Sequence, residues 1–360
     1  MSEDARTTPP ARRRRPVLDA VVMCALFALL LGALGAAFAS LHREFWSASA
    51  FVERYVETIA AGDASGTLAI PGVAAESPDL EQIGRPLASE ALLRSAVLTH
   101  DIADVHATSE IPKRGAEGAD AVEVTVAYTI DGRPDESSYL VEQDGRSGLV
   151  PSWRFETSPL GVVDLVVRGS WQLTVNGFEI DKRQVSPDGV EADPLAPLSL
   201  LVFSPGVYDV AVDTAATVAA ATPVRATGSL EIDELDLQTQ PSEELTELVQ
   251  TKVDEFLDEC ATQQVLQPAG CPFGETIEWG FAQPDVAWSI DDYPRTSLAP
   301  DGDDWRVAPA RGTAHLAVTV QDLFTGQLLP HEAAVPFTLE ARVDLLEGDQ
   351  VHIEIDRVDG

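Results

Sequence analysis

Two closely spaced cysteines carry the most specific chemistry in this sequence. Cys260 and Cys271 lie in the stretch DECATQQVLQPAGCPFG, with ten residues between them. A zinc site would need two further ligands, and the nearest histidine, His315, is more than 40 residues away. A nucleophilic cysteine would need a neighbouring histidine or arginine, which PAGCPFG does not contain. The pair therefore predicts a disulfide, which persists where thiols are oxidised.

A group of aspartates in DDYPRTSLAPDGDDW is the best candidate for binding a cation. Calcium binds several carboxylates and carbonyls on one loop. The spacing does not match a helix-loop-helix calcium site, and a hairpin turn with solvated aspartates is the alternative. The candidate residues are Asp291, Asp292, Asp301, Asp303 and Asp304.

The histidines indicate no catalytic centre. His100 and His106 flank DIADV. One hypothesis is that they form a metal site or an acid-base cluster with Asp101 and Asp104, and the alternative is that they occupy ordinary solvated positions. His331 opens HEAAV, which lacks the second histidine of the zinc-protease motif. Apart from the cation candidates above, we therefore nominate no catalytic residue, no cofactor and no metal ligand from the sequence.

Five tryptophans fall in strand-like segments, where they are either core residues or a platform for a glycan or peptide. Aromatic faces offer apolar area without charge, which suits both roles. The residues are Trp153, Trp171, Trp279, Trp288 and Trp305.

The elements that must position these residues suggest three domains after residue 45. In the first, residues 45–158, an amphipathic helix with Phe51, Tyr55, Val56 and Ile59 precedes alternating strands. The second, 160–228, reads as a small β-sandwich. In the third, 229–360, Ser242 is the expected N-cap of a helix that ends near Cys260 and is followed by strands. Helix first and antiparallel sheet afterwards predicts an α+β multidomain ectodomain.

The N-terminus predicts a membrane anchor. Residues 1–19 form a basic tail, and residues 20–41 are expected to be a transmembrane helix because AVVMCALFALLLGALGAAFA has no charge. The arginine run before this segment predicts a cytoplasmic N-terminus and an extracellular C-terminal part on a single-pass signal anchor of the cell membrane. The alternative is a signal peptide cleaved near Ala39.

The charge limits the partners. A formal net charge of −35 argues against nucleic acid. The expected partners are the membrane, through the anchor, and cell-wall material or envelope proteins.

The segments FVERYVETIAAGD, VTVAYTIDG and WRF resemble the cystatin-like cone of the nuclear-transport-factor superfamily. The pair VNG and SPGVYDVAV is similar to small β domains of bacterial surface proteins. The order of anchor, cone and β domain resembles the teicoplanin-resistance-associated membrane proteins. That family usually begins with a zinc ribbon, whereas this chain has no cysteine before the apolar segment.

These observations together favour a non-enzymatic, membrane-anchored binding protein of the bacterial cell envelope. One alternative is a carbohydrate-active or other hydrolytic enzyme, and another is a structural spacer or a subunit of a membrane complex.

Overall fold

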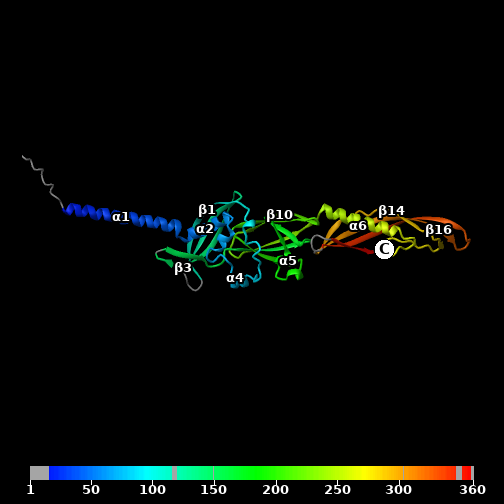
Figure 1. Ribbon diagram of the computed structural model, residues 1–360, viewed down its shortest axis with the longest axis horizontal. Coiled ribbons are helices and arrows are strands. Elements are labelled where there is room, and N and C mark those ends of the chain that lie inside the picture. The colour runs from blue at the N-terminus through cyan, green and yellow to red at the C-terminus, as the bar shows by residue number, and fades with distance from the viewer. Residues whose placement is uncertain (1–15, 116–119, 149, 303, 346–350, 358–360) are drawn as a thin grey trace, which may run out of the picture.

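The computed structural model describes residues 16–115, 120–148, 150–302, 304–345 and 351–357. It has the form of an elongated rod in which three β-rich domains follow one another (Figure 1). Helix α1 (Pro16–Phe45) projects from one end, and the hairpin of β16 and β17 forms the other.

Helix α1 does not confirm the predicted anchor. Its described side chains, at positions 21–35, are exposed. Crossing a bilayer requires about 20 consecutive apolar residues. Within the described residues, no helix combines the length and the apolar character needed to cross a membrane. This finding contradicts three predictions: the transmembrane helix over 20–41, the signal anchor and the single-pass localisation.

The first domain packs one helix on an antiparallel sheet. Helix α2 (Ala48–Ala60) begins at Ser47, whose side chain accepts a hydrogen bond from the Ala50 N–H. Its apolar face packs on the four-stranded sheet, as the 3-and-4 spacing predicts. The sheet order is β1 (Ile102–Arg114), β2 (Asp120–Ile130), β3 (Arg133–Ser147) and β4 (Val150–Phe155). Short helices α3 (Ala64–Leu68) and α4 (Ser77–Gln82) and a 3₁₀ turn (Ser95–Val97) lie between α2 and β1.

The middle domain is a sandwich of two sheets. One sheet has the order β11 (Ile232–Gln238), β5 (Gly161–Arg168) and β8 (Leu198–Val202). The other has the order β12 (Gln240–Pro241), β10 (Thr217–Ala226), β9 (Gly206–Asp213), β6 (Gln172–Val175) and β7 (Phe178–Asp181), and β7 is followed by α5 (Lys182–Val185). Because β11 pairs in parallel with β5, the segment after 228 belongs here rather than to the third domain.

The third domain packs α6 (Glu243–Ala261) on a curved sheet. Ser242 caps the helix, accepting the Leu245 N–H at 2.9 Å. Buried Val249, Val253 and Leu257 pack with Trp305 in one core. The central strands are β16 (Asp304–Asp322) and β17 (Leu328–Leu345), and the others are β13 (Gly280–Ala282), β14 (Ala287–Asp292), β15 (Leu298–Asp301) and β18 (Val351–Arg357).

The chain is mostly β, with 47% strand and 22% helical residues. Six α-helices are described, and α3, α4 and α5 have six residues or fewer. The strands are long, since β16 runs for 19 residues and β17 for 18. The prediction of an α+β multidomain ectodomain on a single transmembrane helix is therefore wrong. The segments with alternating apolar and polar residues form long β-strands, which hold about twice as many residues as the helices.

Candidate functional site: an exposed aromatic tip

The end of the rod that lies farthest from α1 carries a cluster of exposed apolar side chains. Phe324 is 92% exposed, Phe281 67%, Leu328 61% and Trp279 38%. Leu323 and Leu329 are also exposed. Contiguous exposed apolar patches on folded proteins mark interaction sites more often than scattered single residues do. We call these six side chains the aromatic tip: Trp279, Phe281, Leu323, Phe324, Leu328 and Leu329.

A hydrogen-bonded turn presents Phe324 at the point of the hairpin. The Asp322 Oδ1 atom accepts the N–H groups of Phe324 at 2.9 Å and Thr325 at 2.7 Å, and the Thr325 hydroxyl at 3.0 Å. Hydrogen bonds from the backbone N–H groups, first that of Thr325 and then that of Phe324, hold the pKa of Asp322 below its ordinary value. Gly326 completes the turn with φ +68°, which glycine adopts without strain. The exposed phenyl ring is therefore carried by a fixed backbone.

Strand β13 brings the remaining aromatic residues to the turn. Gly280 pairs with Asp322 in the antiparallel register, and the Leu323 N–H donates to the Trp279 carbonyl at 3.3 Å. A Cβ at Gly280 would lie 2.3 Å from Val320 Cγ1, so only glycine allows this close approach. The Trp279 ring meets the His331 ring edge-on, with centroids 5.8 Å apart. Three separate segments thus meet at this end of the hairpin.

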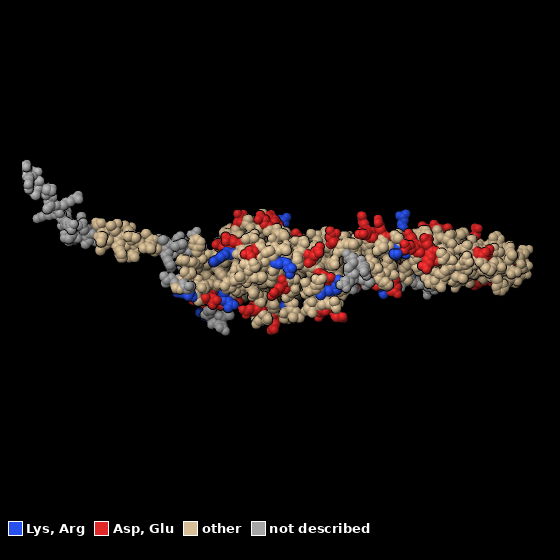
Figure 2. Space-filling model, viewed as in Figure 1, with Lys and Arg blue, Asp and Glu red and all other residues tan. Residues whose placement is uncertain are grey.

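Lysine and arginine are missing from the segments around the aromatic tip. Residues 253–294 and 312–341 contain none, but they contain 12 aspartates and glutamates. On the face drawn in Figure 2, the hairpin end is largely tan, with a few red side chains and no blue ones. The tip is therefore an apolar surface without nearby lysine or arginine, on an acidic domain.

The predicted disulfide is confirmed and lies in this domain. Cys260 at the end of α6 is bonded to Cys271, and both cysteines are buried in the core of the third domain. The loop after the bridge places Phe273 against Trp288, with ring centroids 5.0 Å apart. The Trp288 Nε1–H donates to the Val265 carbonyl at 2.8 Å. The bridge thus fixes the loop against Trp288 of β14, in the same sheet whose hairpin carries the aromatic tip.

The other tryptophans serve packing. Trp288 and Trp305 are buried, and half-buried Trp153 donates to the Trp46 carbonyl at 3.0 Å. Half-buried Trp171 lies against the cations of Lys182 and Arg183. The platform hypothesis therefore applies to Trp279.

The structure does not bring the predicted cation residues together. Asp291 and Asp292 end β14, whereas Asp301 and Asp304 face each other where β15 meets β16, and Asp303 lies outside the described residues. Asp292 pairs with Thr313, so nine positions of β16 separate the two places, about 30 Å at about 3.3 Å per residue. In the described ranges, no group of three or more His, Cys, Asp or Glu residues could hold a metal ion.

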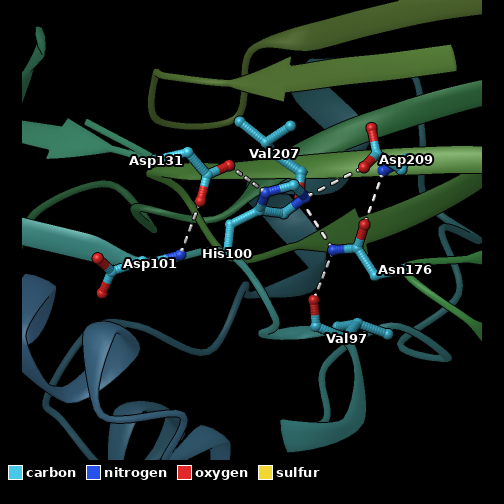
Figure 3. A network of polar contacts seen from close by, with 7 residues as sticks. All are labelled: Val97, His100, Asp101, Asp131, Asn176, Val207 and Asp209. Atoms are coloured by element: carbon cyan, nitrogen blue, oxygen red, sulfur yellow. Dashed lines mark hydrogen bonds and ion pairs between the residues drawn. The ribbon is translucent and has the colours of Figure 1, made fainter. Parts of the chain in front are cut away.

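His100 lies in a polar network that joins the first and middle domains (Figure 3). Its Nδ1 atom is 2.7 Å from the Asp131 carboxylate and its Nε2 atom is 3.5 Å from that of Asp209. Asn176 donates to the carbonyls of Val97 and Val207 at 2.6 and 2.9 Å, and accepts the Asp209 N–H at 2.7 Å. The adjoining cavity measures about 10 Å³, which is room for about one water molecule. The network is a domain junction.

The other residues of the histidine hypothesis do not join this network through their side chains. His106 Nδ1 is 2.7 Å from the Asp104 carbonyl. Asp101 contacts Asp131 through its backbone, donating its N–H to the carboxylate and accepting the Asp131 N–H at its carbonyl. The hydrogen bond from His100, followed by the one from the Asp101 N–H, holds the pKa of Asp131 below its ordinary value. The proposed metal or acid-base cluster is not assembled.

A polar cavity of about 270 Å³ on the middle domain tests the hydrolase alternative. Its lining includes Glu179, Asp181 and Asp213. Burial pushes the pKa of Asp181 upward, but hydrogen bonds from the side chain and N–H of Arg183 outweigh it and keep the pKa below its ordinary value. A glycosidase acid needs a raised pKa. Asp181 is therefore suited to pairing with Arg183 and not to proton donation.

Of the aromatic tip, only Trp279 was singled out from the sequence. The missed signal was the segment LFTGQLL, Leu323–Leu329, in which apolar residues surround a turn where polar residues are usual. Comparisons with protein families, with curated proteins and with solved structures gave no match. The resemblance to the teicoplanin-resistance-associated proteins and to the cystatin-like cone remains a prediction.

Proposed function

We propose that this protein is a non-enzymatic binding protein of the bacterial cell envelope that contacts its partner through the aromatic tip. The single observation that carries the proposal is Phe324, 92% exposed on a turn held by Asp322. Exposing this ring to water is unfavourable, and burying it against a partner would contribute about 1.5 to 3 kcal/mol.

The build of the third domain supports a binding role. Buried side chains of α6 and the disulfide hold the sheet from one face, while β16 and β17 extend beyond them to the turn. A rigid support reduces the ordering cost of association. Two titratable groups considered above for catalysis make structural contacts instead: Asp181 pairs with Arg183, and His100 with Asp131.

Co-sedimentation with envelope material tests the proposal. The purified full chain is mixed with bacterial sacculi that retain their attached proteins, and separately with sacculi stripped by protease. Wild type is compared with Phe324→Ser and with Val190→Ser, a matched control in which an 82% exposed apolar residue of the middle domain is replaced.

We expect wild type and Val190→Ser to sediment with the envelope material and Phe324→Ser to remain in the supernatant. Loss of retention on stripped sacculi would assign the contact to a protein partner, and unchanged retention would assign it to the glycan. If Phe324→Ser sediments like wild type, or if wild type does not sediment with either preparation, the proposal is wrong.

A further inference from the structure

The carboxylates around the aromatic tip have no cationic partner in the described part of the chain. Glu278 adjoins Trp279, Glu332 adjoins His331, and Asp285 lies on the loop after β13, and all three are exposed. No ion pair with lysine or arginine is described for any of them, unlike Asp164 with Arg85 or Asp236 with Arg168 elsewhere in the molecule. We call Glu278, Asp285 and Glu332 the acidic rim.

At least one carboxylate of the rim is held in its ionised form by the fold. The Asp285 side chain accepts the Thr319 hydroxyl at 2.6 Å and the Thr319 N–H at 3.2 Å. These bonds, the hydroxyl first, lower the pKa of Asp285. An apolar centre thus lies beside fixed negative charge, which is the complement of a surface that is apolar in the middle and basic at its edge.

Charge distinguishes among the classes of molecule that could bind at the aromatic tip. A second copy of this chain would bring its own carboxylates to the contact, and anionic polymers or lipids would be repelled by a chain of net charge −35. A neutral glycan would use the aromatic rings but would gain nothing from the rim. A polypeptide with lysines or arginines beside an apolar face satisfies both features.

We propose that the aromatic tip and the acidic rim together bind a cationic amphipathic polypeptide segment. The proposal rests on the proposed function and names the partner chemistry of the same surface. The apolar face of the segment covers Phe324 and Phe281, and its basic side chains reach the carboxylates of the rim. The position of the tip at the extreme end of the rod leaves it open to such a segment from several directions (Figure 1).

Two synthetic peptides test the inference with the full chain. One is an 18-residue amphipathic helix of leucine and lysine, and the other has glutamate in place of every lysine. Binding is measured by fluorescence anisotropy of the labelled peptide at several salt concentrations. The variants are Phe324→Ser for the tip, Glu278→Gln with Glu332→Gln for the rim, and Val190→Ser and Glu136→Gln as exposed controls in the other two domains.

We expect the lysine peptide to bind and the glutamate peptide not to bind. Phe324→Ser should weaken binding of the lysine peptide at least about tenfold, because a buried phenyl ring is lost. The rim variant should weaken binding several-fold and flatten the dependence on salt, since exposed charges are screened within about 8 Å at 0.15 M salt. The two controls should stay within about twofold of wild type.

The alternative outcomes separate the two proposals. Equal binding of both peptides would overturn the charge argument. Unchanged binding by Phe324→Ser would show only unspecific attraction to an acidic protein, and would also overturn the inference. If envelope material retains the protein through Phe324 while the lysine peptide does not bind, the inference fails and the proposed function stands. If neither binds, both fail.

Discussion

Removing the disulfide should destabilise the third domain alone. Cys260 and Cys271 are 11 positions apart, and closing a loop of this size stabilises the folded chain by about 2 to 3 kcal/mol through the entropy of the unfolded state. The third domain, residues 243–357, gains about 0.24 kcal/mol/K of entropy on unfolding at about 2.1 cal/mol/K per residue. The double variant Cys260→Ser, Cys271→Ser should therefore melt about 10 °C lower.

Differential scanning calorimetry of the full chain measures this shift. The transition of the third domain is identified with Leu257→Ala, since truncating a fully buried leucine of α6 costs about 2 to 5 kcal/mol. The first and middle domains are joined by contacts such as Arg85 to Asp164 and His100 to Asp209. They should therefore share one transition, which should not move because the bridge lies in the third domain. Cys24→Ser serves as the control for cysteine replacement and should leave both transitions unchanged.

Three results would refute this reasoning. If the double variant melts within about 2 °C of wild type, the bridge does not constrain the unfolded third domain as the loop-closure argument requires. If both transitions move together, the third domain is not a separate unfolding unit. Thiol labelling of Cys260 and Cys271 without prior reduction would contradict the bridge itself.

Three further predictions address the tip and the domain junction. Phe324→Ser should change the free energy of unfolding by less than about 0.5 kcal/mol in urea denaturation, because an exposed ring contributes little to the fold; a larger loss would place it in a core. Gly280→Ala should cost about 1 to 3 kcal/mol and weaken envelope retention, because the new Cβ meets Val320 and forces β13 away from β16; wild-type behaviour in both assays would contradict the described pairing. Asp131→Asn should flatten the acid side of the melting-temperature profile: a carboxylate whose pKa is lowered in the fold adds stability above its unfolded pKa of about 3.9 and loses it as the pH falls through the folded value. Parallel profiles for Asp131→Asn and wild type would show that His100 does not hold this carboxylate.

Local patterns in the sequence were sufficient for several elements. The spacing of Phe51, Tyr55, Val56 and Ile59 identified the buried face of α2, and Ser242 was correctly placed as the N-cap of α6. These features depend on residues within one or two helical turns. The disulfide followed from elimination among the few reactions available to two isolated cysteines.

Features that depend on distant pairing could not be predicted. Nothing in Ile232–Gln238 itself indicates that it pairs in parallel with β5, some 70 residues earlier, so the third domain was expected to begin too soon. Likewise, the apolar residues of an exposed turn look like core residues until the pairing of β13, β16 and β17 shows that Phe324 is left 92% exposed at the end of the hairpin.

Site-specific photo-crosslinking tests the central claim most directly, namely that the aromatic tip is the contact surface. A benzoylphenylalanine is placed at Phe324, and in a separate protein at Val190, which is similarly exposed on the middle domain. Both proteins are irradiated in intact cells that produce them. We expect a discrete adduct from position 324 and none from position 190. No adduct from position 324, or the same adducts from both positions, would contradict it.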